Sequence, residues 1–317
     1  MTAAVRVGGF ILLLFVVGLL ATGLGRAVGP IDAVASEETG LGGTGGMEMP
    51  AKPGPQRAPD AIPGGLMSSQ NGYTLQPSAS ILDADADAPV AFRVLGPDGR
   101  PVEAYTPSHE KPLHLIAVRR DLASYQHVHP VLGNDGVWRA ALDLSQAGDY
   151  RLIADFVPTA DDEPVTLGTD LSVAGEYAPQ PLPAPSRTAR VGDYTVTLGG
   201  RLVPGEESAL TLSVSRDGRP VTDLQPYLGA YGHLVVLRGG DLAYLHVHPA
   251  GEPGDGTTRP GPAIRFFTNT PSPGTYRLLL DFRHEGVVRT AGFTVATEGR
   301  AVDTSTGTGH GSDGHGH

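Results

Sequence analysis

Histidine is the residue whose type and spacing stand out in this chain. All eleven histidines lie beyond residue 108, and six of them form two trios with the same spacing between the first two members. Neutral imidazole nitrogen is a ligand for zinc and copper, so three imidazoles that converge on one point would form a metal site. The trios are His114, His127 and His129, followed by His233, His246 and His248.

The last two histidines of each trio are two residues apart. On a strand, residues at this spacing leave the same face, with Cα atoms about 6.5–7 Å apart. If residues 114–118 and 125–129 form a hairpin that turns at Asp121 and Leu122, residue 114 lies opposite residue 129, at about 5 Å. The spacing therefore predicts one three-histidine copper or zinc site per trio. The alternative is structural: the first histidine is buried and bonded to a neighbouring strand, and the other two are exposed.

Further side chains near the trios are candidates for an auxiliary ligand or for a second-shell acceptor that fixes an imidazole tautomer. An aspartate in a turn also caps its own backbone, which is the competing role for the two aspartates. The last eight residues are too rich in glycine to fold and are suited to loose capture of Cu(II), Ni(II) or Zn(II). The candidates are Asp121, Asp241, Tyr125, Tyr244 and, in the tail, His310, His315 and His317.

The two trios belong to two copies of one longer pattern. Asp98-Gly-Arg-Pro-Val102 recurs as Asp217-Gly-Arg-Pro-Val221, and each trio is followed by a Gly-x-Tyr-Arg-Leu segment that closes soon after with Asp-Phe. The order of these motifs is the same in both copies, which indicates a tandem repeat.

Composition and periodicity predict an all-β fold. The chain of 317 residues contains 44 Gly and 28 Pro, which favour short strands joined by turns. Short apolar or alternating runs such as VAFRVLG and HLVVLR predict the strands of a sandwich. We expect two tandem immunoglobulin-like or cupredoxin-like β-sandwiches, at residues 70–176 and 188–297, joined by a proline-rich spacer at 177–187.

The N-terminus predicts export. An uncharged apolar run at residues 8–25 favours an uncleaved signal anchor within residues 1–27, a single pass through the cell membrane with the domains outside the cytoplasm. The alternative is a cleaved signal peptide, because an A-x-A pattern occurs at residues 33–35, and the protein would then be secreted. Residues 28–69 have the composition of a flexible Gly/Pro linker, and residues 298–317 that of a disordered tail.

Several classes of function are excluded or disfavoured. The chain has no cysteine, so disulfides, thiolate zinc sites and iron–sulfur clusters are excluded. A net charge of −11 disfavours nucleic acid as a partner. Nucleophile elbows, phosphate-binding glycine loops and H-E-x-x-H helices are absent, so we do not expect an enzyme; a zinc hydrolase or hydratase with an open three-histidine site is the remaining catalytic alternative.

The His-Leu-(Ile/Val)-x-(Val/Leu), Asp-Leu and His-Val-His-Pro motifs of both repeats resemble those of exported actinobacterial tandem β-sandwich proteins, and more distantly YtkA-like and copper-resistance type envelope domains. The resemblance implies an envelope location and handling of heavy metals. We therefore expect a membrane-tethered, extracytoplasmic protein that buffers copper or zinc or delivers it to another envelope protein. The alternative is a tandem immunoglobulin-like adhesion or scaffold module with structural histidines.

Overall fold

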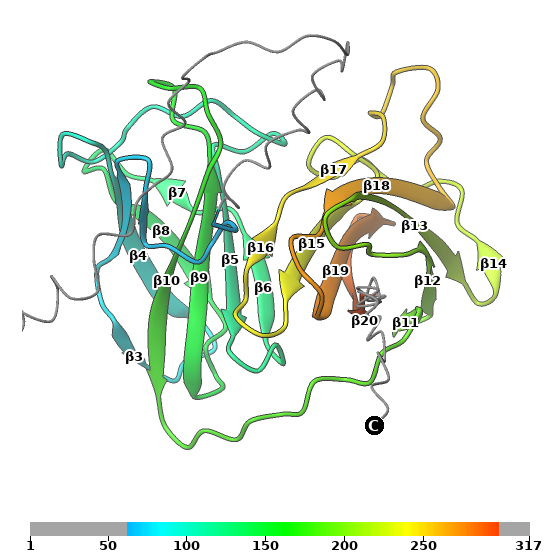
Figure 1. The fold of residues 1–317 in the computed structure, drawn as a ribbon, viewed down its shortest axis with the longest axis horizontal. Helices are drawn as coiled ribbons and strands as arrows, with labels where there is room; N and C mark the ends of the chain where they lie inside the picture. Colours follow the sequence, from blue (N-terminus) through cyan, green and yellow to red (C-terminus); the bar gives the residue numbers. More distant parts are fainter. Residues whose placement is uncertain (1–61, 298–317) are drawn as a thin grey trace, which may run out of the picture. The chain divides into compact units, whose positions relative to one another are not determined.

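The computed structural model of the protein describes residues 62–297, and within that range every regular element is a strand (Figure 1). The prediction of an all-β fold is confirmed. The expected signal anchor, most of the expected linker and the histidine-bearing tail lie outside the described residues. No helix within residues 62–297 is long and apolar enough to cross a membrane.

The first repeat is a sandwich of two sheets. One sheet has the order β1-β2-β4-β8-β7, and the other has the order β3-β10-β9-β5-β6. The strands are β1 (Ser69–Gln70), β2 (Tyr73–Pro77), β3 (Ile81–Asp83), β4 (Ala88–Leu95), β5 (Leu113–Arg119), β6 (Tyr125–Val128), β7 (Val131–Leu132), β8 (Trp138–Leu142), β9 (Gly148–Phe156) and β10 (Val165–Ala174).

The second repeat has the same plan. The order β11-β12-β13-β18-β17 forms one sheet, with β14 paired to β13, and β16-β15-β19-β20 forms the other. The strands are β11 (Thr188–Val191), β12 (Tyr194–Gly200), β13 (Glu207–Arg216), β14 (Arg219–Pro220), β15 (His233–Arg238), β16 (Tyr244–Leu245), β17 (Val247–Pro249), β18 (Ala263–Asn269), β19 (Thr275–His284) and β20 (Val287–Ala296).

The strand order is that of the immunoglobulin fold. In that fold the A, B, E and D strands share one sheet while C, F and G share the other, and β2-β4-β8-β7 and β5-β9-β10 occupy these positions. A tyrosine corner closes each repeat: the hydroxyl of Tyr150 donates to the carbonyl of Gln146, and that of Tyr276 to the carbonyl of Ser272, both at 2.8 Å. The sequence pattern leaves the immunoglobulin-like and cupredoxin-like topologies open, and the strand order shows the immunoglobulin-like one.

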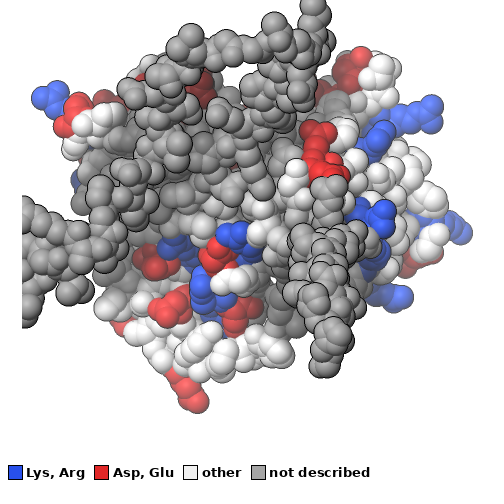
Figure 2. All heavy atoms as spheres, viewed as in Figure 1, with Lys and Arg blue, Asp and Glu red and all other residues white. Residues whose placement is uncertain are grey.

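A third apolar cluster joins the repeats. It combines Ile116, Val118 and Ile153 of the first repeat with buried side chains of β15, β16 and β19, and both repeats belong to one compact unit. Leu237 at its centre is fully buried. Acidic and basic side chains are interspersed over the visible part of the face shown in Figure 2. The junction between the sandwiches is therefore an apolar packing of the β5 and β15 sheets.

One predicted boundary needs correction. Residues 62–69, assigned to the linker, are part of the fold: Gly65 donates its N–H to the carbonyl of Thr166 at 3.0 Å, and Arg151 donates to the carbonyls of Gly65 and Leu66. The spacer at 177–187 is held on the fold, since the N–H of Gln180 donates to Asp121 at 2.8 Å and Leu182 packs against the apolar cluster. Backbone polar groups that find partners in a sheet or turn are not free to act as a tether.

Candidate metal centre

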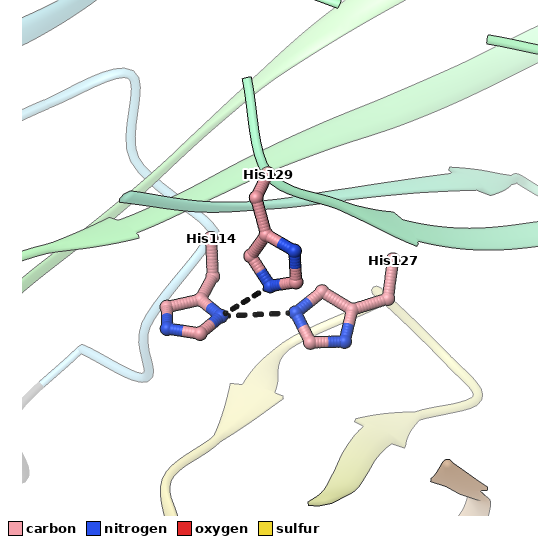
Figure 3. Close-up of side chains that lie close together, drawn as sticks. All are labelled: His114, His127 and His129. Carbon is pink, nitrogen blue, oxygen red and sulfur yellow. Dashed lines mark hydrogen bonds between the residues drawn. The ribbon is translucent and has the colours of Figure 1, made fainter. Parts of the chain in front are cut away.

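The first trio of histidines converges at one end of the β5–β6 hairpin. β5 and β6 pair through Leu115 and Val128, so residues 114 and 129 face each other one step further along, as the spacing predicts. The side chains of His114, His127 and His129 each point one nitrogen inward, and these three atoms lie within 4.8 Å of one another (Figure 3). Among the described residues this is the single group of three or more histidine, aspartate or glutamate side chains gathered in this way.

The spacing of the three nitrogens fits a metal ligand set. Nδ1 of His114 lies 3.1 Å from Nε2 of His127 and 3.2 Å from Nε2 of His129. Nitrogens bound to one tetrahedral zinc at about 2.0–2.1 Å are about 3.3 Å apart. Two of the three nitrogen pairs thus have about the separation of ligands on one ion, and all three nitrogens lie within 4.8 Å of one another.

Two outer hydrogen bonds assign the tautomers in this cluster. Nε2 of His114 lies 2.9 Å from the carbonyl of Ser108, and Nδ1 of His127 lies 3.1 Å from Oδ2 of Asp281. A carbonyl and a carboxylate only accept, so each of these ring nitrogens carries the proton. The inward nitrogens of His114 and His127 then present lone pairs to each other across 3.1 Å, and such a contact is stable only with a cation between them.

The environment disfavours a proton on two of the three rings, those of His114 and His129. Burial lowers the pKa of His114 to about 4, with the neighbouring His127 lowering it further and the hydrogen bond to Ser108 opposing the shift. Burial likewise lowers the pKa of His129 to about 3. The imidazoles of His114 and His129 are therefore neutral at physiological pH, which is the form that binds a metal ion.

The second trio does not converge. β15 and β16 pair through Val236 and Leu245, the same register as in the first repeat, but the chain then moves to the opposite sheet, where Val247 pairs with Thr268. Leu245 and Val247 face the core of the second repeat, so His246 and His248 point outward and are exposed. Their rings lie 4.5 Å apart at a solvent-facing pocket of about 390 Å³. The predicted second site is corrected accordingly: the structure does not gather His233 with these two residues.

His233 instead lies beside the first trio. Its ring centroid is 4.8 Å from that of His127 and 5.5 Å from that of His114. His109, which the spacing analysis does not assign to a site, lies 5.5 Å from His233. Burial lowers the pKa of both rings. Two further imidazoles thus lie beside the three-histidine cluster, His109 from the first repeat and His233 from the second.

The auxiliary candidates take other roles. Asp121 and Asp241 lie outside the cluster: each binds a neighbouring arginine, Arg119 or Arg238, and accepts the N–H of the residue two positions on. These aspartates are turn caps, as in the competing interpretation, and the structure gives no support to them as ligands. The hydroxyl of Tyr244 lies 3.5 Å from Oδ2 of Asp155. Burial raises the pKa of Tyr125 and Tyr244 well above the ordinary value, so both phenols are neutral.

The histidine spacing does not point to one functional candidate, Asp281, which is the counterpart of Asp155 in the first repeat. Both belong to the repeated Asp-Phe motif, and each lies opposite the first histidine of its own repeat in the β-ladder, Asp155 opposite His114 and Asp281 opposite His233. The repetition of this motif at the end of the Gly-x-Tyr-Arg-Leu segment was the available signal. That each aspartate pairs with a histidine on the neighbouring strand follows only from the β5–β9 and β15–β19 pairing.

With this geometry established, comparison with known proteins places the chain in a family. A family described as "Domain of unknown function (DUF8832)" matches residues 68–175 and 189–299, so its two matches coincide with the two repeats. The chain belongs to the DUF8832 family. The family description assigns no function, so the resemblance to copper-resistance type domains stays a prediction. No curated protein matches the sequence.

Solved structures show distant similarity to this DUF8832 protein. InvD of Yersinia pseudotuberculosis is 14% identical, with 76% of this chain and 61% of InvD covered at a TM-score of 0.24. The Escherichia coli adhesin FdeC is 16% identical, with 75% and 67% covered at a TM-score of 0.23, and a putative membrane anchored protein from Corynebacterium diphtheriae is 11% identical, with 72% and 57% covered at 0.21. The chain spans less than two-thirds of InvD. These alignments establish no shared function.

Proposed function

We propose that this DUF8832 protein binds one divalent transition-metal ion, copper or zinc, through His114, His127 and His129. The observation that carries the proposal is the pair of inward lone pairs 3.1 Å apart, fixed by the Ser108 carbonyl and the Asp281 carboxylate on the outer nitrogens. Three imidazole ligands suit Zn(II), Cu(II) and Ni(II), and copper(II) binds most tightly at a given nitrogen site.

We further propose that the site serves metal buffering or delivery outside the cytoplasm, with the N-terminal apolar run as the membrane tether. The second repeat has no gathered ligand trio, so the expected stoichiometry is one tight ion per chain rather than two. A catalytic role is not part of this proposal, because the described site offers no proton acceptor beyond the imidazoles and the Asp281 carboxylate that already holds His127.

The experiment is metal analysis of the full chain. Purified protein is stripped with a chelator and titrated with Cu(II) and Zn(II) by calorimetry, with elemental analysis of the loaded protein. We expect close to one tight ion per chain, lost in His127→Ala/His129→Ala. The matched control is His246→Ala/His248→Ala, which removes the same dipeptide pattern from the second repeat and should keep the tight ion. A folded wild-type protein that binds neither metal contradicts the proposal.

The second candidate is a tandem immunoglobulin-like scaffold or adhesion module with structural histidines. The observation that favours it is the apolar junction, in which Val118, Val235 and Leu237 are each fully buried, because such a junction holds two sandwiches in one fixed arrangement. Under this candidate the histidine substitutions lower the stability of the fold and leave the metal content unchanged. The same titration therefore separates the two functions.

A further inference from the structure

Asp281 is a buried carboxylate from one repeat at the metal-binding cluster of the other. It is 3% exposed, and its Oδ2 accepts the Nδ1–H of His127 at 3.1 Å, in a pair whose side chains are 1% and 4% exposed. Its other oxygen, Oδ1, accepts from the hydroxyl of Thr290 at 2.6 Å. A carboxylate that accepts the outer N–H of a metal-binding histidine fixes the ring and raises its basicity.

The arrangement is pseudo-symmetric. Asp155 of the first repeat accepts from Thr166 at 2.7 Å, as Asp281 accepts from Thr290, and it faces Tyr244 of the second repeat. In each repeat the aspartate therefore holds one oxygen in its own sheet and turns the other toward the partner repeat. Only Asp281 meets a histidine of the three-nitrogen cluster there, because His246 leaves with β17 for the opposite sheet.

The distance between Asp281 and His127 is set by the junction. The two residues are 154 positions apart in the chain and lie in different sandwiches. Their contact therefore requires the two sandwiches to stay packed. The apolar cluster around Ile116 and Leu237 provides that packing, and Arg120 donates to the carbonyl of Gly240 at 3.2 Å on the same junction. The orientation of one metal ligand thus depends on docking of the second repeat.

We propose that the metal site is shared between the repeats: the first repeat supplies the three nitrogens, and Asp281 of the second acts as the positioning residue for His127, so that metal binding and docking of the repeats strengthen each other. This inference rests on the proposed metal-binding function. Coupling between two equilibria is reciprocal, so the factor by which docking raises the metal affinity is also the factor by which the metal favours docking. Removal of such an outer carboxylate typically weakens metal affinity about 10- to 100-fold.

The test compares Asp281→Asn with Asp155→Asn in the full chain. Each variant removes one carboxylate of the same Asp-Phe motif, but of the two only Asp281 is hydrogen-bonded to a cluster histidine. Zn(II) affinity is measured by competition with a chelator, and the Co(II)-loaded protein gives an absorption spectrum that reports the ligand geometry. We expect Asp281→Asn to weaken Zn(II) binding about 10- to 100-fold and to change the Co(II) spectrum, while Asp155→Asn retains both.

Docking is read out by limited proteolysis within the spacer at 177–187, which packs along the junction. Zn(II) should slow cleavage of the wild type and of Asp155→Asn, and have little effect on Asp281→Asn. If Asp281→Asn does not fold, Thr290→Val replaces it, with Thr166→Val as its control, and a loss confined to Thr290→Val supports the proposal. If the wild type binds metal and the variant and its control bind it with equal affinity, this inference alone is overturned. If the wild type binds no metal, the proposed function is overturned.

Discussion

The metal-free protein should lose stability in mild acid because of one buried histidine. His114 is 2% exposed, and burial holds its pKa at about 4, against about 6.5 in an unfolded chain. Between these values the unfolded state binds a proton that the folded state does not, so the free energy of unfolding falls as the pH falls below 6.5. Integrated from pH 8 to pH 5, the proton linkage of His114 alone amounts to about 2 kcal/mol.

The measurement is urea unfolding of chelator-treated protein at pH 8 and pH 5, for the wild type and for His114→Gln. Glutamine does not titrate, so the variant should lose about 2 kcal/mol less than the wild type between the two pH values. His129 and His233 have pKa values shifted in the same direction, chiefly by burial, and remain in both proteins, so most of the difference reports on His114. An identical loss in the two proteins would refute the assignment of a buried, neutral His114.

Three further perturbations test other parts of the structure. Asp121→Ala should destabilise the fold by about 3–5 kcal/mol, since it leaves the buried Arg119 without its carboxylate, while metal stoichiometry by elemental analysis stays the same; loss of the ion would restore Asp121 as a ligand. Tyr276→Phe removes the hydroxyl that bonds the carbonyl of Ser272 and should cost about 1 kcal/mol in chemical unfolding, and an unchanged midpoint would show that this tyrosine corner is dispensable. Gly168→Ala places a Cβ against the carbonyl of Gly65, so the backbone of segment 64–67 must shift away. This segment should then be cleaved rapidly in limited proteolysis. Resistance equal to that of the wild type would contradict the docking of this segment.

The first three-histidine cluster could be predicted from the sequence because its geometry is local. A strand, a turn and a returning strand fix residues 114 and 129 opposite each other once Leu122 adopts the left-handed conformation of the turn, with φ of 62°. The same reasoning applied to the second repeat failed, although the ladder there keeps the same register. A strand pair predicts which residues face each other only for as long as the strands remain paired.

The failure in the second repeat has a physical reason that lies outside the histidine spacing. Leu245 stands where the first repeat has Gln126, and this leucine is 4% exposed in the core of its sandwich. Val247 is also buried, and it pairs with Thr268 of β18 in the opposite sheet. The chain therefore leaves β15 at Leu245, and His246 does not lie beside His233. Gln126 is polar and does not need burial in the core. Its side chain hydrogen-bonds the backbone of Asp143 instead.

The role of Asp281 could not be read from local pattern at all. Its contact with His127 spans 154 positions and depends on how two sandwiches pack, which follows from the apolar outer faces of β5 and β15 together. Those faces were visible as fully apolar runs in the sequence, but such a run is equally consistent with a strand buried inside one sandwich. The partner of an apolar face is a tertiary property.

The docked N-terminal segment has a mechanical consequence. Gly64 pairs with Tyr244 of the second repeat, and Gly65 with Thr166 of the first, so the chain enters the fold at the seam between the sandwiches. A pull along the chain ahead of residue 62 would load the seam first, through a few main-chain hydrogen bonds, before it reached any long strand. Tension at that end would therefore detach this segment from the second repeat, at the Gly64–Tyr244 bridge, before it unravelled any long strand of either sandwich.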